Sequence, residues 1–221
     1  MENAARPPST PVCQVSEALN WRYAVKAFSD QEIPQDILDA LIDALRLAPS
    51  FVGLQPYRVS VLQDTELRQR LIPHSFNQVK VATSSALFVV SVDTKITDKT
   101  VEDYVCELAA ARGVEPSKMA DLEAKAKAYV GTMTADVRVD WAKRQAYLAV
   151  GQLLTAAAIL GVDACPMEGF SAADYDRILG LTERGQTTTL LIAAGYRAAD
   201  DRFASLPKFR RSTGEFVLDH R

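Results

Sequence analysis

The segment Ala86–Val92 constrains the fold more than any other part of the sequence. It reads ALFVVSV, so nearly every position is apolar and several side chains are β-branched. We expect such a strand to be buried on both faces, because a half-exposed strand would alternate apolar and polar residues. The segment Thr187–Ala194 has a similar character and predicts a second core strand. Other elements must therefore cover both faces of the sheet.

Helices are predicted around these strands. The longest covers residues 136–160 and ends where Gly161 can terminate it, and its second half is apolar nearly all round, as in a central or interface helix. Another opens at residues 33–36 and carries an apolar face at i, i+3, i+4 spacing up to Leu45, before Pro49. Further helices are predicted over residues 65–71, 100–112, 116–129 and 171–179, and further strands over 57–62 and 216–218.

The order of these elements predicts the fold class. Helices and strands do not alternate regularly, which favours an α+β fold with a central mixed β-sheet flanked by helices. No repeat or linker divides the chain, so residues 13–221 are predicted to form one domain. Residues 1–12 are small, polar and proline-rich and are interpreted as a flexible tail. The longest apolar runs are far shorter than the roughly 18–20 residues that span a bilayer, so we expect a soluble, cytoplasmic protein.

Composition and spacing argue against several classes of function. A net charge of −3 gives no basic field for nucleic acid. Two histidines and three scattered cysteines without a C-x-x-C pair predict neither a metal site nor a disulfide framework. No G-x-G-x-x-G fingerprint occurs, and residues 180–187 approach a phosphate-binding loop only in part, because Gln186 stands where its lysine would be. That segment is interpreted as a turn.

Three other segments gather residues that could bind a ligand. Arg22–Phe28 carries two cations four residues apart, Ala48–Tyr57 is a turn-rich connection, and Leu206–Arg211 is a basic cluster. Taken singly, they are typical of a solvated helix face, an ordinary loop and a surface patch. Taken together and in this order, with Trp141–Tyr147 and Pro166–Phe170, they resemble the nitroreductase family.

That family has an R-[HY]-S-x-[KR]-x-[FY] segment, a helix followed by A-P-S-x-x-N-x-Q-P-[WY], a P-x-E-G-F segment and a final K-x-R element. This chain reads RYAVKAF, APSFVGLQPY, PMEGF and KFR in the same order, from about Trp21 to Arg210. The resemblance implies an FMN-dependent oxidoreductase that uses NADH or NADPH to reduce nitroaromatics, quinones or related small acceptors by ping-pong hydride transfer. It also implies an intertwined homodimer with FMN at the interface.

The resemblance further implies which residues bind the cofactor. Arg22, Lys208 and Arg210 would hold the phosphate, since guanidinium forks match its oxygens. Lys26 and Lys80 would place positive charge at the polar end of the flavin ring. The other cofactor-binding residues implied are Tyr23, Ala24, Pro49, Ser50, Phe51, Gly53, Asn77, Gln145, Pro166, Met167, Glu168 and Gly169. Because the flavin carries the chemistry, no residue is predicted to be a catalytic acid and no metal is required.

The implied roles around the ring differ from residue to residue. Glu168 and Gly169 would offer backbone N–H groups near N5, the atom that accepts the hydride. Pro166 and Met167 would pack against one ring face, and Asn77 would hydrogen-bond the polar edge. Three of the residues would come from the other subunit: Pro49, Ser50 and Gly53.

The chain also departs from the family pattern. Tyr23-Ala24 stands where many members have His-Ser, Phe51 follows Ser50, and Gly53 replaces a common asparagine. Phe51 is interpreted as shaping the pocket for quinones or an unsaturated carbonyl. Two alternatives stay open: a flavin enzyme of the same fold with another chemistry, such as enone reduction or dehalogenation, and a non-catalytic flavin-binding dimer. Residues 97–134 are where a lid would lie, and Cys165 is interpreted as a buried small hydrophobe, with a redox role left open.

Overall fold

The computed structural model describes residues 11–219, and residues 1–10 and 220–221 lie outside the described part. Most of the predicted tail therefore lies outside it, although helix α1 already begins at Pro11. With η for a 3-10 helix, the elements are α1 (Pro11–Trp21), α2 (Gln35–Arg46), η1 (Phe51–Gly53), β1 (Tyr57–Leu62), α3 (Thr65–Leu71), η2 (Pro73–Ser75), α4 (Lys80–Thr83), β2 (Ala86–Asp93), α5 (Asp98–Ala111), η3 (Pro116–Met119), α6 (Ala120–Gly131), α7 (Ala135–Ile159), β3 (Asp163–Met167), α8 (Ala172–Leu179), η4 (Thr182–Arg184), β4 (Gln186–Gly195) and α9 (Thr213–Phe216).

The described part of the chain forms one sheet with the strand order β1-β2-β4-β3. All neighbouring strands in it pair antiparallel. The α+β class is thus confirmed, but the sheet is antiparallel and not mixed, contrary to the prediction from the sequence. Irregular alternation of helices and strands argues against a doubly wound parallel sheet, yet it does not set strand directions, which depend on where each connection re-enters the sheet.

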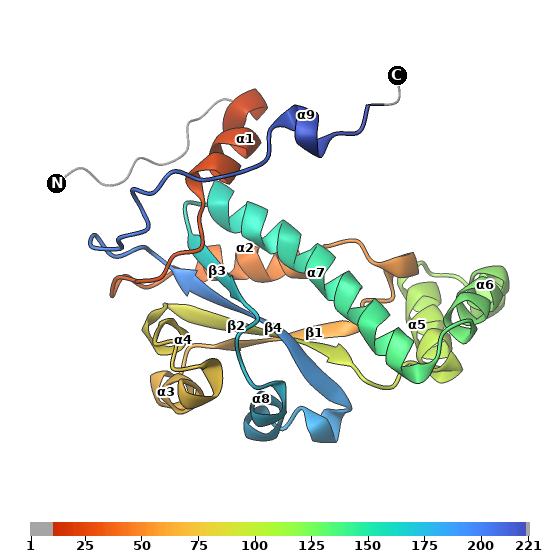
Figure 1. The fold of residues 1–221 in the computed structure, drawn as a ribbon. Coiled ribbons are helices and arrows are strands. Elements are labelled where there is room, and N and C mark those ends of the chain that lie inside the picture. Colours follow the sequence, from red (N-terminus) through yellow and green to blue (C-terminus); the bar gives the residue numbers. More distant parts are fainter. Residues whose placement is uncertain (1–10, 220–221) are drawn as a thin grey trace.

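Strand β2 is buried on both faces, as its apolar run predicts. Leu87 and Val89 belong to one hydrophobic cluster, and Phe88 and Val90 belong to another on the opposite face. Figure 1 shows α2 and α7 on one side of the sheet and α3, α4 and α8 on the other. The alternation of side chains along a strand therefore divides the core into two layers.

Helix α7 packs on the sheet but leaves part of its second half exposed. Ala149, Val150 and Leu153 are buried, whereas Leu148 is 52% exposed and Ile159 is also exposed. A helix that is apolar on its exposed side as well is typical of an interface. None of the described helices has both the length and the apolar character required to cross a membrane.

Several elements differ from the prediction. Strand β3 is missing from it, because five residues that include Pro166 give a weak strand signal, although an edge strand tolerates proline. The strand expected at 216–218 is wrong: Ser212 and Glu215 form a capping box that starts the short helix α9. Residues 180–185 reverse the chain as expected, through η4 between the left-handed Gly180 and Gly185, whereas Gln186 and Thr187 already belong to β4.

Candidate flavin-binding site

A basic pocket is lined by segments from near both ends of the described chain. Residues 20–26, at the end of α1 and just after it, and residues 203–210 line one cavity of about 460 Å³. It brings together six of the residues singled out from the sequence: Arg22, Tyr23, Ala24, Lys26, Lys208 and Arg210. Nearly 190 residues separate these two groups in the chain, so only the fold assembles this cluster of cations.

Asp201 fastens one wall of the basic pocket to the other. This carboxylate is 5% exposed and accepts hydrogen bonds from the N–H groups of Lys26 (2.8 Å) and Ala27 (3.3 Å) and from the hydroxyl of Tyr23 (3.1 Å). Burial alone would raise its pKa, but these bonds and one from the N–H of Phe203 favour the charged form, so the pKa of Asp201 lies below its ordinary value. The segment after α1 is therefore held in one conformation.

A second clamp lies behind the same segment. Arg197 donates to both oxygens of Asp163, with distances down to 2.6 Å, and its guanidinium lies over the rings of Trp21 (4.3 Å) and Tyr23 (4.6 Å). Bidentate pairing and ring stacking both use the planar shape of arginine. Both oxygens of Asp163 are bonded to Arg197, so Asp163 acts on the cations of the pocket only at longer range, where its charge partly offsets the lowering of the Arg22 pKa.

The cations of the basic pocket repel one another. Burial and the charge of Arg210 lower the pKa of Arg22. Burial, Arg22 and Arg210 likewise lower the pKa of Lys208. No carboxylate in residues 11–219 forms an ion pair with any of these three side chains. An anion bound among them would relieve the repulsion, so the pocket fits a phosphate.

Lys208 has a structural role that the sequence did not predict. Its ammonium donates to the carbonyl oxygens of Leu19 (2.6 Å), Asn20 (2.9 Å) and Arg22 at the end of α1. An ammonium has three donors, and these bonds use all of them. Arg22, by contrast, donates no side-chain hydrogen bond to the described residues, so its guanidinium is free to bind an anion. This difference between Lys208 and Arg22 depends on the end of α1, a helix that the sequence did not predict.

A second group of expected residues borders the basic pocket. Nζ of Lys26 lies 3.9 Å from Sγ of Cys165, the residue directly before Pro166. Cys165 itself is fully buried, as expected. The Pro166–Gly169 segment then follows at the end of β3. The structure therefore places the expected phosphate ligands and the expected ring contacts next to each other within one chain.

Glu168 and Gly169 are each held by a hydrogen bond from another element. Oη of Tyr147, on α7, donates to Oε1 of Glu168 at 2.6 Å, and burial together with this bond raises the pKa of Tyr147 to about 12. Nε2 of Gln78 donates to the carbonyl of Gly169 at 3.0 Å, and a Cβ on Gly169 would lie only 3.1 Å from Gln78 and from the ring of Phe76. Tyr147 and Gln78 were not among the predicted site residues, because their partners lie far away in sequence.

The segment that contributes Gln78 also carries the two remaining ring contacts. Phe76 and Asn77 both adopt left-handed backbone conformations, which turn the chain sharply into α4. Asn77 is exposed, and Lys80 is only 7% exposed. The contact between Gln78 and Gly169 places this turn beside the P-x-E-G-F segment.

The loop with Pro49, Ser50, Phe51 and Gly53 is not part of this cluster. Figure 1 shows η1 beside α5 and α6, whereas α1 and the C-terminal segment lie at the other end of α7. The N–H of Phe51 donates to Oε1 of Gln145 at 2.9 Å, so Gln145 belongs with this loop. One chain alone does not bring the loop to the basic pocket.

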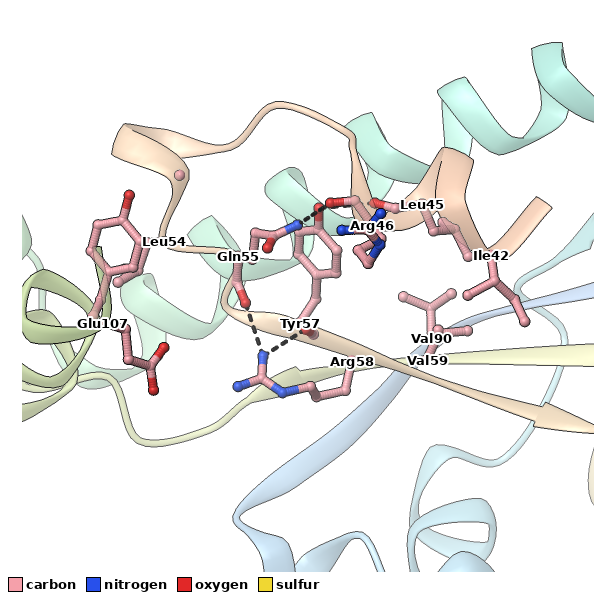
Figure 2. Close-up of a pocket in the computed structure, with 12 residues that line it drawn as sticks. Ile42, Leu45, Arg46, Leu54, Gln55, Tyr57, Arg58, Val59, Val90 and Glu107 are labelled. Carbon is pink, nitrogen blue, oxygen red and sulfur yellow. Dashed lines mark hydrogen bonds between the residues drawn. The ribbon is translucent and has the colours of Figure 1, made fainter. Parts of the chain in front are cut away.

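A second cavity, which the sequence did not predict, lies beside this loop. It has a volume of about 440 Å³ and is bounded by α2, β1 and α5. Figure 2 shows Gln55 reaching the carbonyl of Arg46 (2.6 Å) and Arg58 reaching the carbonyls of Gln55 (3.0 Å) and Tyr57 (2.8 Å). These contacts tie the loop to α2 and to the open edge of β1.

Comparisons with known proteins agree with this arrangement. The model of the family described as "Nitroreductase family" matches residues 19–196. The relative YfkO of Bacillus subtilis is described as a proposed NAD(P)H nitroreductase. It is 30% identical to this chain over 216 residues, which cover 92% of this chain and 96% of YfkO.

Solved structures share the fold. The structure of ydfN from Bacillus subtilis, described as a proposed nitroreductase, has a TM-score of 0.83 at 23% identity and covers 94% of this chain and 99% of its own. A proposed nitroreductase from Exiguobacterium sibiricum, solved in complex with FMN, has a TM-score of 0.78 at 23% identity and covers 97% and 99%. Both therefore have the same architecture of sheet and helices.

Proposed function

The chain belongs to the nitroreductase family, and from this premise we propose that it is an oxidoreductase that binds FMN and uses NADH or NADPH to reduce small acceptors. The observation that carries the proposal is the basic pocket. Arg22 and Arg210 converge there, and neither forms an ion pair with a carboxylate among the described residues. Cations gathered in one pocket attract an anion, and the phosphate of FMN is an anion of suitable size and charge.

The phosphate would be held by Arg22 and Arg210. Their planar guanidinium groups can each donate two parallel hydrogen bonds. Lys208 adds positive charge, while its ammonium keeps the end of α1 in place. Asp201 and the pair Asp163–Arg197 fix the backbone that carries Arg22. The pocket is thus preorganised, which lowers the entropy cost of binding.

The flavin ring would extend from the basic pocket toward Pro166–Gly169. When bound, FMN supplies hydride transfer between the nicotinamide and the acceptor. Lys26 and Lys80 would place positive charge at the polar end of the ring, with Asn77 as a hydrogen-bonding partner. Tyr147 would hold the side chain of Glu168 and Gln78 the carbonyl of Gly169. The backbone N–H groups of these two residues would face N5, and Pro166 and Met167 would cover one ring face. The chain's own contribution is to bind, orient and polarise.

A homodimer would complete the site. The exposed apolar side of α7 and the exposed Phe209 (84%) and Leu218 (82%) in the C-terminal segment support an interface. Under two-fold symmetry, the loop Pro49–Gly53 of one protomer can lie over the basic pocket of its partner. The distance between these two features within one chain supports this arrangement.

The acceptor would be a flat aromatic or quinoid molecule. The loop presents Phe51 and the side-chain-free Gly53 where the family pattern often has polar residues. Phe51 stacks on Tyr129 with ring centroids 4.6 Å apart and lies edge-on to Trp141 at 5.5 Å. This aromatic cluster favours stacking with a planar substrate over hydrogen bonding to it.

FMN titration and anaerobic reduction test the proposal. The purified protein should take up FMN and turn yellow, and its flavin absorbance should bleach on addition of NADH or NADPH. We expect Arg22→Ala and Arg210→Ala each to weaken FMN binding roughly 10–100-fold, since a hydrogen bond to a charged group contributes about 1.5–3 kcal/mol. Arg184→Ala, at an exposed arginine of η4 away from the pocket, is the matched control and should bind FMN normally.

The outcomes separate the alternatives. A protein that binds no FMN would contradict the proposal outright. A protein that binds FMN through Arg22 but bleaches with neither nucleotide would favour a non-catalytic flavin-binding dimer. A panel of quinones, nitroaromatics and enones then identifies the acceptor class.

A further inference from the structure

The turn within the loop between α2 and β1 has an unusual backbone. Val52 has φ 47° and ψ 7°, Gly53 has φ 90°, and Gln55 has φ 45°. A β-branched residue such as Val52 is a steric outlier in the left-handed region, so this conformation costs free energy. Contacts from outside the turn must hold it.

Besides the bond from Gln55 to Arg46 of α2, such contacts come from three helices. The hydroxyl of Tyr104, on α5, donates to the carbonyl of Val52, and burial raises its pKa, so it stays protonated at neutral pH. The ring of Phe51 stacks on Tyr129 of α6, and its N–H bonds to Gln145 of α7. Helices α5 and α6, which the sequence marked only as the place for a lid, therefore support the turn directly.

Tyr104 also occupies the space that a side chain at position 53 would need. A Cβ built on Gly53 would lie 2.6 Å from Oη of Tyr104 but 3.5 Å from its Cζ. The first distance is a collision and the second is an ordinary contact. The hydroxyl of Tyr104, and not its ring, thus excludes a side chain at position 53.

We propose that Tyr104 is a positioning residue that holds the turn Ser50–Gly53 through the Val52 carbonyl and thereby sets which acceptors reach the flavin of the partner subunit. The inference rests on the proposed function, because only the homodimer brings this turn to a flavin. Without the hydroxyl, the turn loses the hydrogen bond to the Val52 carbonyl and space opens beside residue 53. The kcat/KM for bulky acceptors should then rise relative to the kcat/KM for small ones.

A double-mutant cycle tests the contact between Tyr104 and position 53 without measuring enzyme activity. The variants are Gly53→Ala, Tyr104→Phe and the double variant, and the readout is the melting temperature. Alanine at φ 90° is strained in both backgrounds, so this part cancels. We expect Gly53→Ala to lower Tm at least twice as much when the Tyr104 hydroxyl is present. Equal decreases in the two backgrounds would overturn the proposal.

Acceptor selectivity tests the functional part. On FMN-loaded enzyme, kcat/KM is measured for a naphthoquinone and for benzoquinone. Tyr104→Phe should raise the ratio of kcat/KM for the naphthoquinone to kcat/KM for benzoquinone at least threefold. Tyr196→Phe is the matched control, because the Tyr196 hydroxyl makes no hydrogen bond to the described residues, and it should leave the ratio unchanged. An unchanged ratio in active Tyr104→Phe enzyme overturns the positioning role and leaves the proposed function intact.

The two tests also distinguish this inference from the proposed function. If the wild-type protein binds FMN but reduces no acceptor, the proposed function fails and the selectivity claim is overturned with it. The melting cycle would still show whether Tyr104 and Gly53 compete for the same volume.

Discussion

The basic pocket and the turn Ser50–Gly53 are both built from irregular segments next to helices, but different interactions stabilise them. In the pocket, a buried carboxylate and a bidentate ion pair fix residues that lie far apart in sequence. In the turn, ring stacking and a few hydrogen bonds hold a strained local backbone. Directional polar contacts specify one geometry, whereas aromatic packing adapts to changes of volume.

This difference matches the two tasks that we propose. A phosphate has one charge pattern, so its binding site benefits from rigid polar clamps. Acceptors vary in shape, so their site benefits from a wall that can be changed by one or two substitutions. The comparison predicts that the pocket is sensitive to pH and intolerant of substitution, and that the turn is less so.

The largest effect is expected from Asp201→Ala in the pocket. It removes the acceptor for the N–H groups of Lys26, Ala27 and Phe203 and for the Tyr23 hydroxyl. Leaving these donors unpaired should cost roughly 3 kcal/mol or more of the free energy of unfolding. Urea denaturation measures it. Asp200→Ala, at the exposed neighbour, is the control and should stay within about 0.5 kcal/mol of wild type.

The pH dependence gives Asp201 a further test. Its native pKa is lowered, so its stabilising contribution is present above its ordinary pKa and is lost as the pH falls through the lowered value. The stability difference between wild type and Asp201→Asn should therefore be largest near neutral pH and shrink in acid. A difference that stays constant into strong acid would show that the charge of Asp201 does not matter.

Sequence patterns fixed most elements but few of the contacts that build the site. Strand β1 and helix α3 have the predicted bounds, because apolar spacing and nearby turn residues mark both. Helix α1 was hidden next to a proline-rich stretch, and with it the bonds of Lys208. The neighbourhood of Arg22 and Arg210 could be inferred from the family resemblance only, since no local pattern encodes proximity across nearly 190 residues.

Polar clamps were the least predictable part of the site. Asp201 and Asp163 look like ordinary surface carboxylates in the sequence, and their burial depends on tertiary packing. The competition between Tyr104 and Gly53 is similarly invisible, because it depends on a distance of a few ångströms between two elements. Propensity and periodicity describe single elements, whereas these contacts arise between elements.

A smaller effect is expected from Phe51→Ala in the turn. Its half-buried ring contacts Tyr129 and Trp141, so its loss should cost about 2 kcal/mol, less than the 3–5 kcal/mol typical of a fully buried phenylalanine. This cost should not depend on pH between about 5 and 8, because no charge is involved. Phe51→Leu should recover part of it. If Phe51→Ala weakened FMN binding as much as Arg22→Ala does, the division between pocket and turn would be wrong.

The smallest effect is expected from Lys208→Met, which tests whether this cation serves the fold or the phosphate. It removes three hydrogen bonds to carbonyls at the end of α1, and because water can replace them in part, the loss should be about 1 kcal/mol in urea denaturation. Arg211→Met removes a neighbouring exposed charge and is the matched control. FMN binding should weaken only a few-fold in Lys208→Met, well short of the effect of Arg210→Ala. If Lys208→Met weakened FMN binding as much as Arg210→Ala does, Lys208 would have to leave the end of α1 to bind the phosphate. The pocket would then rearrange when FMN binds.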